Sequence, residues 1–463
     1  MVSKLEKTFH LTERGSTVKT EVYAGFTTFF AMAYIIFVNP AMLSYGNEQI
    51  FDGVFFATCI SAAIGTLLMA FLANLPFAQA PGMGLNALFA FTAMPALAAM
   101  AGDPEMDLVK QYQMALCLVL ISGIIFIVIT VLGLREQIIS AIPNNIKLSI
   151  SAGIGFFIAF LGLQNAGIVV SSPATLVDLV NFTDYAASAS AALALFGLML
   201  LAVLSCLKIN GAILISIVAT TVLSYLVGHS VMPSDFSMNI ATQGQNFMDV
   251  SLFKMDFVSI FASGNVTATL SSLFVLIVSM SLVDMFDSIG TFIGTASKAN
   301  LLDKDGQMPA MRKALMCDAI ATTAGACLGT STVTTYVESA AGVYEGGKTG
   351  MTSLVTGALF LVALVFAPFI GLVPACATAP ALIYVGYLMI TSIGKVELDD
   401  ISEGLPAFLT IAMMPLTYSI ANGIGFGLIS YVIIKACTGK MKEIKPATWV
   451  ITALFLVKYV VPM

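Results

Sequence analysis

Two stretches of the chain decide its fold: PFAQAPGMGLNALFAF (76–91) and LGTSTVTTYVESAAGVYEGGKTG (328–350). Both lie among long apolar runs. The first is broken by Pro and Gly, whereas the second is rich in β-branched and hydroxyl residues and contains Glu338. Irregular backbone at membrane depth survives only where it is buried in protein or lines a cavity. The two stretches therefore indicate a membrane protein with two interrupted spans around an internal site.

The composition also indicates that the protein lies in a lipid bilayer. Of 463 residues, 58% are hydrophobic and only 10% are charged, whereas soluble domains carry roughly 25% charged residues. No basic patch suggests a nucleic-acid partner. The seven cysteines are scattered without CxxC or Cys/His spacing, so neither a metal nor a cofactor is expected. The two histidines, His10 and His229, lie outside the apolar runs, which leaves carboxylates as the groups able to carry a proton.

Segments of about 20 apolar residues can each cross the bilayer as a helix. The chain is therefore predicted to be an all-α polytopic membrane protein. Segment 446–462 is short and fits either a further span or a surface position. The fourteen predicted spans are 20–43, 54–75, 82–98, 114–134, 146–165, 188–207, 210–228, 268–294, 310–328, 333–345, 350–372, 377–394, 404–420 and 422–437.

Charge and spacing organise these spans into two halves. With a cytoplasmic N-terminus, the outer loops hold only Lys110 and Lys254, as the positive-inside rule requires. The broken segments are third and tenth in order, and Glu338 follows Asn86 by 338 − 86 = 252 positions; the same shift moves Thr20 to 272, near the start of span 8. A unit of seven spans repeated once must be inverted, and paired interrupted spans point to a transporter site at the midplane.

This organisation divides the chain into five predicted regions. The first seven-span repeat and the second seven-span repeat are separated by an external loop and flanked by a cytoplasmic N-terminus and a C-terminal tail. In chain order the regions are 1–19 (N-terminus), 20–228 (first repeat), 229–267 (external loop), 268–437 (second repeat) and 438–463 (tail).

Carboxylates within the spans are the strongest candidate site residues. Span 8 reads SLVDMFDSIGTF, which places Asp284 and Asp287 three apart on one helical face. Glu338 belongs to span 10. A charge at the bilayer centre costs at least roughly 2.5–3.5 kcal/mol, so such residues usually face a polar cavity and mark function, although one could simply lock helices together. Asp318 on span 9 is expected nearer the cytoplasmic edge, where it either belongs to the site or only orients a loop.

Asn86 and its neighbours offer groups of a different kind. The Asn86 amide is both donor and acceptor, which suits the edge of a heterocycle. Glycines such as Gly84 let the backbone approach a ligand, although small residues also serve helix packing. Tyr336 precedes Glu338 by two positions, so in extended backbone both side chains would point into one cavity.

Two motifs of soluble nucleotide-binding proteins also occur. Residues 82–87 match G-x-G-x-x-A, and residues 342–349 match the GxxxxGK[ST] of a P-loop. The first motif lacks the βαβ unit and the acidic residue about 20 positions on that a dinucleotide site needs. The second motif needs a soluble α/β domain, whereas here a membrane span follows it. We therefore expect no ATPase and no other enzyme.

Several longer stretches carry a family resemblance: APGMGLNA, DMFDSIGT, SKANLLDKDGQMP, GTSTVTTYVESAAGV, ATAPALIYVGYLM and PAFLTIAMMPLTYSIANGIGFG. They resemble the AzgA-like purine branch of the nucleobase:cation symporter-2 family, which includes guanine/hypoxanthine permeases. The resemblance implies a uracil-transporter-like fold with core and gate domains and short antiparallel strands in spans 3 and 10. It also implies proton-coupled purine uptake across the inner membrane, and often dimers.

The resemblance also assigns roles residue by residue. Glu338 and Asp284 would hydrogen-bond the ring nitrogens of a base, and Asn86 would take its exocyclic groups. Asp284, Asp287 or Glu338 would hold the coupling proton. Further substrate-binding groups would be Gly84, Tyr336 and the hydroxyls of Thr332 and Thr334 in the presumed strand.

Other readings remain open at this point. Adenine could replace guanine and hypoxanthine, and Na⁺ could replace H⁺. An anion exchanger of the same architecture would want a basic residue where the chain has Glu338. An ion channel would need pore rings rather than paired broken spans.

Overall fold

Helices make up most of the computed structural model, which describes residues 2–133, 143–173, 175–230, 240–262, 266–298, 308 and 310–460. Within these ranges nine helices are long and apolar enough to cross a membrane, and the chain is therefore a multi-pass membrane protein. Each of the fourteen predicted spans coincides with helical structure, except that the tenth begins as a strand.

The first half contains the elements that precede residue 230. They are α1 (Val2–Phe9), α2 (Val18–Met32), α3 (Ile35–Ser44), α4 (Glu48–Leu68), β1 (Gln79–Pro81), α5 (Met83–Leu88), α6 (Met94–Met100), α7 (Leu108–Val131), α9 (Asn144–Asn165), β2 (Val169–Ser172), β3 (Leu176–Leu179), α10 (Tyr185–Cys206) and α11 (Ala212–Leu226).

The second half mirrors this order, with a strand after its second long helix. Its elements are α12 (Ile240–Asn246), α13 (Val266–Lys298), α14 (Met311–Leu328), β4 (Val333–Thr335), α15 (Ser339–Tyr344), α16 (Gly350–Ala363), α17 (Ala367–Ile370), α18 (Ala375–Ile390), α19 (Ile401–Leu416), α20 (Ile420–Cys437) and α21 (Pro446–Val460).

Polar residues at the starts of several spans explain where those helices begin. The Asn47 side chain accepts from the N–H of Ile50 at the start of α4, and the Ser419 hydroxyl accepts from the N–H of Asn422 at the start of α20. Such caps satisfy N–H groups that have no partner within the helix. In an apolar medium an unsatisfied group would be costly, so these caps fix the level at which each span starts.

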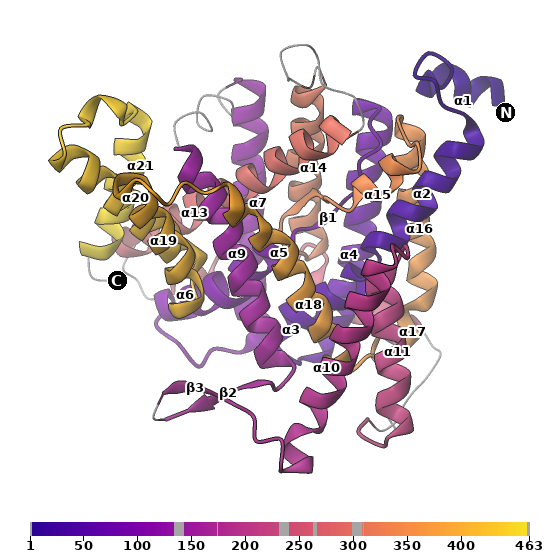
Figure 1. Ribbon diagram of the computed structural model, residues 1–463, viewed down its shortest axis with the longest axis horizontal. Coiled ribbons are helices and arrows are strands. Elements are labelled where there is room, and N and C mark those ends of the chain that lie inside the picture. Colours follow the sequence, from indigo (N-terminus) through magenta and orange to yellow (C-terminus); the bar gives the residue numbers. More distant parts are fainter. Residues whose placement is uncertain are drawn as a thin grey trace.

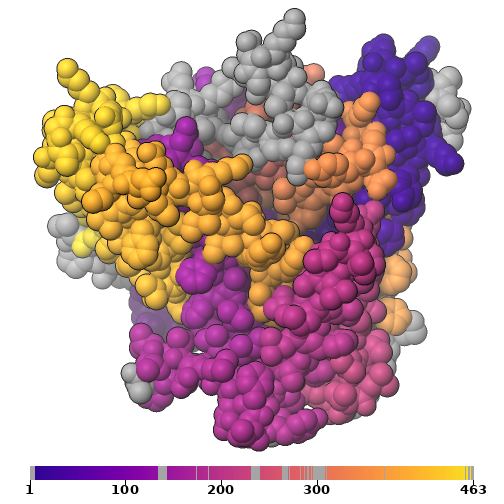
Figure 2. Space-filling model, viewed as in Figure 1, coloured from indigo at the N-terminus to yellow at the C-terminus, as the bar shows by residue number. Residues whose placement is uncertain are grey.

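The helices form two packed groups. One surrounds the strands and contains α2, α3, α4, α7, α14, α15 and α16; the other contains α9, α10, α11, α18, α19 and α20. The first group also includes α5 and α13, and the second includes α21. The groups meet where α5 touches α9, where α13 touches α9, α20 and α21, where α3 touches α18 and where α2 touches α11. Figure 2 shows that the surface of the second group combines α9–α11 with the C-terminal helices, so each group draws on both halves of the chain. These groups correspond to the expected core and gate.

The last apolar segment forms α21, at the left of Figure 1. It runs back along α20: the Tyr459 hydroxyl donates to Asn422 Oδ1 (3.2 Å), and the rings of Phe426 and Tyr459 are 5.6 Å apart. Because Asn422 lies in the first turn of α20, α21 returns over most of the length of that helix. α21 therefore packs antiparallel against α20.

Candidate functional site

The two broken stretches meet as a pair of short strands deep inside the first helix group. β1 pairs antiparallel with β4, and Ala80 lies opposite Thr334. The pairing extends beyond the strands, since the N–H of Gly82 donates to the carbonyl of Thr332 over 3.0 Å. Every strand residue is buried. The predicted strands in spans 3 and 10 are confirmed, and pairing satisfies backbone groups that a helix would otherwise satisfy internally.

Glu338 lies where the chain leaves β4 and turns into α15. Its Oε1 accepts a 2.7 Å hydrogen bond from the hydroxyl of Tyr34, a buried residue at the break between α2 and α3. Extended backbone ends at Thr335, so the extended backbone expected between Tyr336 and Glu338 is not formed. Tyr336 instead donates to the carbonyl of Pro81 (2.5 Å), and its ring centroid lies 6.5 Å from that of Tyr34.

Asn86 joins the two broken stretches directly. It lies in α5, one turn after β1, and its Oδ1 accepts a hydrogen bond from the Ser331 hydroxyl just before β4. Gly84 faces the other helix group: a Cβ at this position would lie 2.8 Å from Cγ2 of Ile154 in α9. Since ordinary carbon–carbon contacts are about 3.5–4.0 Å, only glycine permits this approach. The structure thus places Gly84 against α9, a helix of the second group.

The strand hydroxyls differ in their partners. Thr334 Oγ1 lies 2.9 Å from the hydroxyl of Ser288 in α13. Thr332 is fully buried, and its Oγ1 has no hydrogen-bond partner among the residues that the structure describes. Leaving a buried polar group unpaired costs about 1–3 kcal/mol. Thr332 is therefore the hydroxyl best suited to bond a ligand at the strand pair.

The two acids of α13 reach different neighbours. Asp284 is fully buried, and its Oδ1 lies 3.4 Å from Ser288 Oγ. Asp287 approaches β1, since a Cβ at Gly82 would lie 3.5 Å from Asp287 Oδ2. Asp287 also lies within electrostatic range of Glu338. The structure therefore gathers the predicted acids around the strand pair.

Sequence reasoning missed two polar residues at this centre, Ser288 and Tyr34, and misplaced a third, Asp318. Asp318 is fully buried, with Oδ2 accepting from Ser288 (2.6 Å) and Oδ1 from the Gln79 side-chain amide (3.3 Å). The alternative in which Asp318 only orients a loop at the cytoplasmic edge is wrong, because it bonds a residue of β1. Ser288 could have been found, since it follows Asp284 by four positions and shares its helical face. Tyr34 carries no such signal.

The P-loop-like segment 342–349 binds an acid of this same chain. Glu21, fully buried in α2, accepts hydrogen bonds from the backbone N–H groups of Lys348 (3.0 Å), Thr349 (3.3 Å) and Thr352 (3.2 Å). The Thr352 hydroxyl adds a fourth bond of 2.5 Å. Backbone N–H groups at a helix start attract anions. Here a carboxylate occupies the place that a phosphate takes in a P-loop, and the motif fastens α2 to α16.

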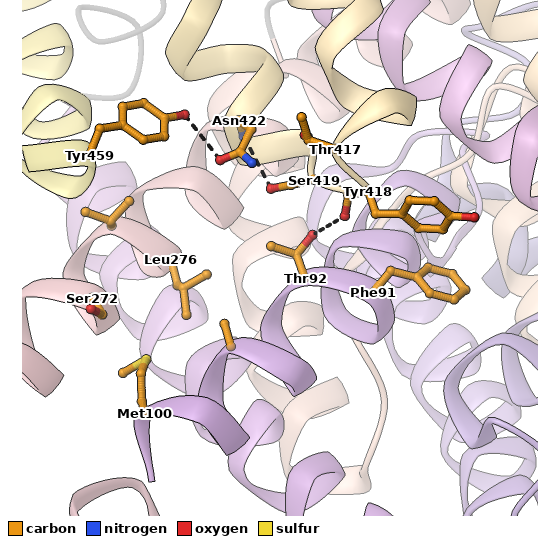
Figure 3. A pocket seen from close by; sticks show the side chains of 12 residues that line it. Phe91, Thr92, Met100, Ser272, Leu276, Thr417, Tyr418, Ser419, Asn422 and Tyr459 are labelled. Atoms are coloured by element: carbon orange, nitrogen blue, oxygen red, sulfur yellow. Dashed lines mark hydrogen bonds between the residues drawn. The ribbon is translucent and has the colours of Figure 1, made fainter. Parts of the chain in front are cut away.

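A cavity of about 400 Å³ lies between the two helix groups on the side of the α19–α20 turn (Figure 3). Phe91, Thr92 and Leu276 line it from the first group, and Tyr418 and Asn422 line it from the second. The Thr92 hydroxyl donates to the Tyr418 carbonyl over 3.5 Å, which bridges the groups beside the cavity. None of the predicted site residues lines this cavity.

Metal binding has no candidate group in the described part of the chain. No cluster of three or more His, Cys, Asp or Glu side chains there could hold an ion. The polar centre at the strands consists of carboxyl, amide and hydroxyl groups, which bind ligands by hydrogen bonds.

The fold and this buried polar centre define a polytopic membrane transporter rather than an enzyme. Over residues 19–426 the chain matches the Permease family of xanthine/uracil permeases, and it belongs to that family.

Named relatives match over nearly their whole lengths. The chain is 42% identical to a putative permease of Methanocaldococcus jannaschii (98% of each chain). It is 41% identical to a guanine/hypoxanthine permease of Bacillus subtilis (97% of this chain, 99% of the relative). It is 40% identical to an adenine permease of Escherichia coli (98% and 96%).

Solved structures agree on the fold. The transmembrane domain of a cyanobacterium bicarbonate transporter superposes with a TM-score of 0.62 at 15% identity, covering 87% of this chain and 97% of that one. The structure of SLC26A9 gives a TM-score of 0.61 at 14% identity, covering 91% of this chain and 66% of that one. At these identities the likeness concerns the fold alone.

Proposed function

We propose that the protein takes up purine nucleobases together with protons by alternating access. Guanine and hypoxanthine are the first candidates for the substrate. The observation that carries the proposal is the strand pair inside the first helix group, around which Glu338, Asn86 and Thr332 lie. A carboxyl, an amide and a hydroxyl match the donors and acceptors on the edge of a purine. Membership of the nucleobase permease family supports the substrate class.

Glu338 is the proposed anchor for the base. Its carboxylate can accept from ring N–H groups, and the Tyr34 hydroxyl holds one oxygen in place at 2.7 Å. A carboxylate at this position favours a neutral heterocycle over an anion. Asn86 would take the exocyclic groups, and Asp284 would support the ring nitrogens. Tyr336, Thr334 and Gly84 complete the proposed surroundings.

Acids at the same centre are the proposed carriers of the proton. Asp284, Asp287 and Glu338 lie around the strand pair, and a carboxyl that is protonated on one side of the membrane and ionised on the other couples proton movement to transport. Neutral Asp284→Asn and Glu338→Gln variants should lose pH-driven uptake. Unchanged uptake in either would contradict the assignment. Glu345→Gln, an exposed acid seven residues after Glu338, is the matched control.

The substrate is tested by competition in cells that lack purine uptake. Radiolabelled hypoxanthine is presented with excess guanine, adenine, xanthine or uracil, with and without a protonophore. We expect guanine to block uptake, uracil to leave it intact, and the protonophore to abolish accumulation. Block by uracil but not by purines would overturn the substrate class.

Adenine is the second candidate, because an adenine permease is nearly as similar to the chain as a guanine/hypoxanthine permease. Stronger block by adenine than by guanine in the same assay would select it.

Orientation and assembly complete the proposal. We place the protein in the inner membrane with its N-terminus in the cytoplasm, because Lys and Arg gather on that side. We also propose a homodimer, which the mass of the purified protein in a lipid nanodisc would test.

A further inference from the structure

Three polar groups from three elements meet at the hydroxyl of Ser288. Its Oγ lies 2.6 Å from Oδ2 of Asp318 in α14, 2.9 Å from Oγ1 of Thr334 in β4, and 3.4 Å from Oδ1 of Asp284 one turn earlier in α13. All four side chains are buried. The proposed function uses Asp284 and Thr334 but gives no role to Ser288 or Asp318.

Counting hydrogens shows what this cluster needs. A serine hydroxyl has one proton to donate and two lone pairs that accept. The 2.6 Å contact is the length of a hydroxyl-to-carboxylate bond, so the Ser288 proton points to Asp318. The contact with Asp284 then needs a proton from the Asp284 side. The geometry thus favours one proton held between two acids, with the serine hydroxyl as the bridge.

The three links differ in length in a way that bears on transport. Ser288 and Asp318 lie within normal hydrogen-bond distance. The 3.4 Å between Ser288 Oγ and Asp284 Oδ1 instead exceeds the 2.5–3.0 Å usual for O–H···O bonds. A movement of about half an ångström would close it. Thr334, in the strand that faces the proposed base site, contacts the bridging hydroxyl from the third direction. A shift of β4 on base binding would therefore reach the bridge directly.

We propose that Asp284, Ser288 and Asp318 form a proton relay, with Asp318 as a second proton-carrying acid. This inference rests on the proposed function. In the transfer, the O–H bond of Asp284 breaks as its proton binds Ser288 Oγ, and the O–H bond of Ser288 breaks as its proton binds Asp318 Oδ2. Ser288 is neutral before and after, the negative charge moves from Asp318 to Asp284, and no electrons are exchanged with another molecule. Gln79, which donates to Asp318 Oδ1 over 3.3 Å, orients the acceptor.

The relay is tested in proteoliposomes by two readouts on the same preparation. Counterflow of radiolabelled hypoxanthine measures movement of the base with no net proton transfer, and a trapped pH dye measures the protons that enter with the base. Ser288→Ala and Asp318→Asn should keep counterflow and lose base-dependent acidification. Ser288→Thr, which keeps the hydroxyl, should recover acidification. Ser279→Ala is the matched control, because this buried hydroxyl of α13 donates to a carbonyl of its own helix, that of Val275.

Each outcome decides between the relay and its alternatives. Wild-type acidification in Ser288→Ala or Asp318→Asn would overturn the relay and leave proton coupling intact. Equal loss of counterflow and acidification in both variants would assign the cluster a structural role and also overturn it. Absence of base-dependent acidification in the wild type would refute the proposed proton coupling itself.

Discussion

Gly84→Ala is predicted to slow transport by separating the two helix groups where they touch. The added Cβ would lie 2.8 Å from Ile154 Cγ2, about 0.7–1.2 Å inside an ordinary carbon–carbon contact. Overpacking a buried contact by one carbon costs about 1–3 kcal/mol. This cost destabilises the conformation in which α5 touches α9, so the population of that conformation should fall about 5- to 150-fold. The maximal rate of hypoxanthine uptake should fall within that range.

The partner residue supplies the rescue. Ile154→Ala removes both the Cγ2 and the Cδ1 atoms that a Gly84 side chain would meet, so the double variant should recover most of the lost rate. Initial uptake rates at saturating and at low hypoxanthine separate the maximal rate from the apparent affinity. The single Ile154→Ala variant is the control for the cavity that this substitution leaves.

Two results would refute this reasoning. A wild-type maximal rate in Gly84→Ala would show that the contact does not form during transport. A loss of apparent affinity that Ile154→Ala does not rescue would show instead that Gly84 approaches the base, as the glycine-rich sequence first suggested.

Three further variants probe the base anchor and the framework around it. Tyr34→Phe removes the hydroxyl that bonds Glu338 and should weaken the apparent affinity for hypoxanthine about tenfold, equivalent to about 1.4 kcal/mol. Glu21→Gln should lower the stability by about 3 kcal/mol, seen as a lower melting temperature, because buried N–H groups lose a charged acceptor. Asp400 has its pKa lowered from 3.8 to about 2 because the Ser402 N–H donates to it. Its stabilisation is present at pH 7 and is lost as the pH falls towards 2, so Asp400→Asn should lower the melting temperature at pH 7 but not at pH 2.

Matched controls make these three predictions specific. Tyr23→Phe, Glu13→Gln and Asp399→Asn repeat each chemical change at an exposed residue and should behave as the wild type. Wild-type affinity in Tyr34→Phe, a wild-type melting temperature in Glu21→Gln, or a pH-independent effect of Asp400→Asn would contradict the corresponding contact.

Much of the fold was predictable because the bilayer imposes strict rules on sequence. Apolar length gave the spans, and the requirement that every backbone group be paired identified the two broken stretches. Asn86 and Glu338 then stood out as polar residues within those stretches, and the structure brings their backbone segments together through β1 and β4.

The remaining contacts depend on how distant segments meet, which one sequence does not state. Tyr34 reaches Glu338 across 304 positions, and Ser288 reaches Asp318 across 30. Gly84 was predicted to approach a ligand. A glycine permits close approach by any neighbour, so the sequence could not indicate that the neighbour is Ile154 of α9. The P-loop-like segment shows the same limit. Its anion-binding motif could be recognised in the sequence, whereas its partner Glu21 could not be predicted.

Accumulation of radiolabelled hypoxanthine in proteoliposomes under an imposed pH gradient tests the central proposal most directly. With the outside acidic, the wild type and Glu345→Gln should concentrate hypoxanthine inside, and a protonophore should collapse the gradient. Glu338→Gln should show no accumulation. Equal accumulation with and without the pH gradient, or full accumulation by Glu338→Gln, would contradict proton-coupled purine transport at the strand pair.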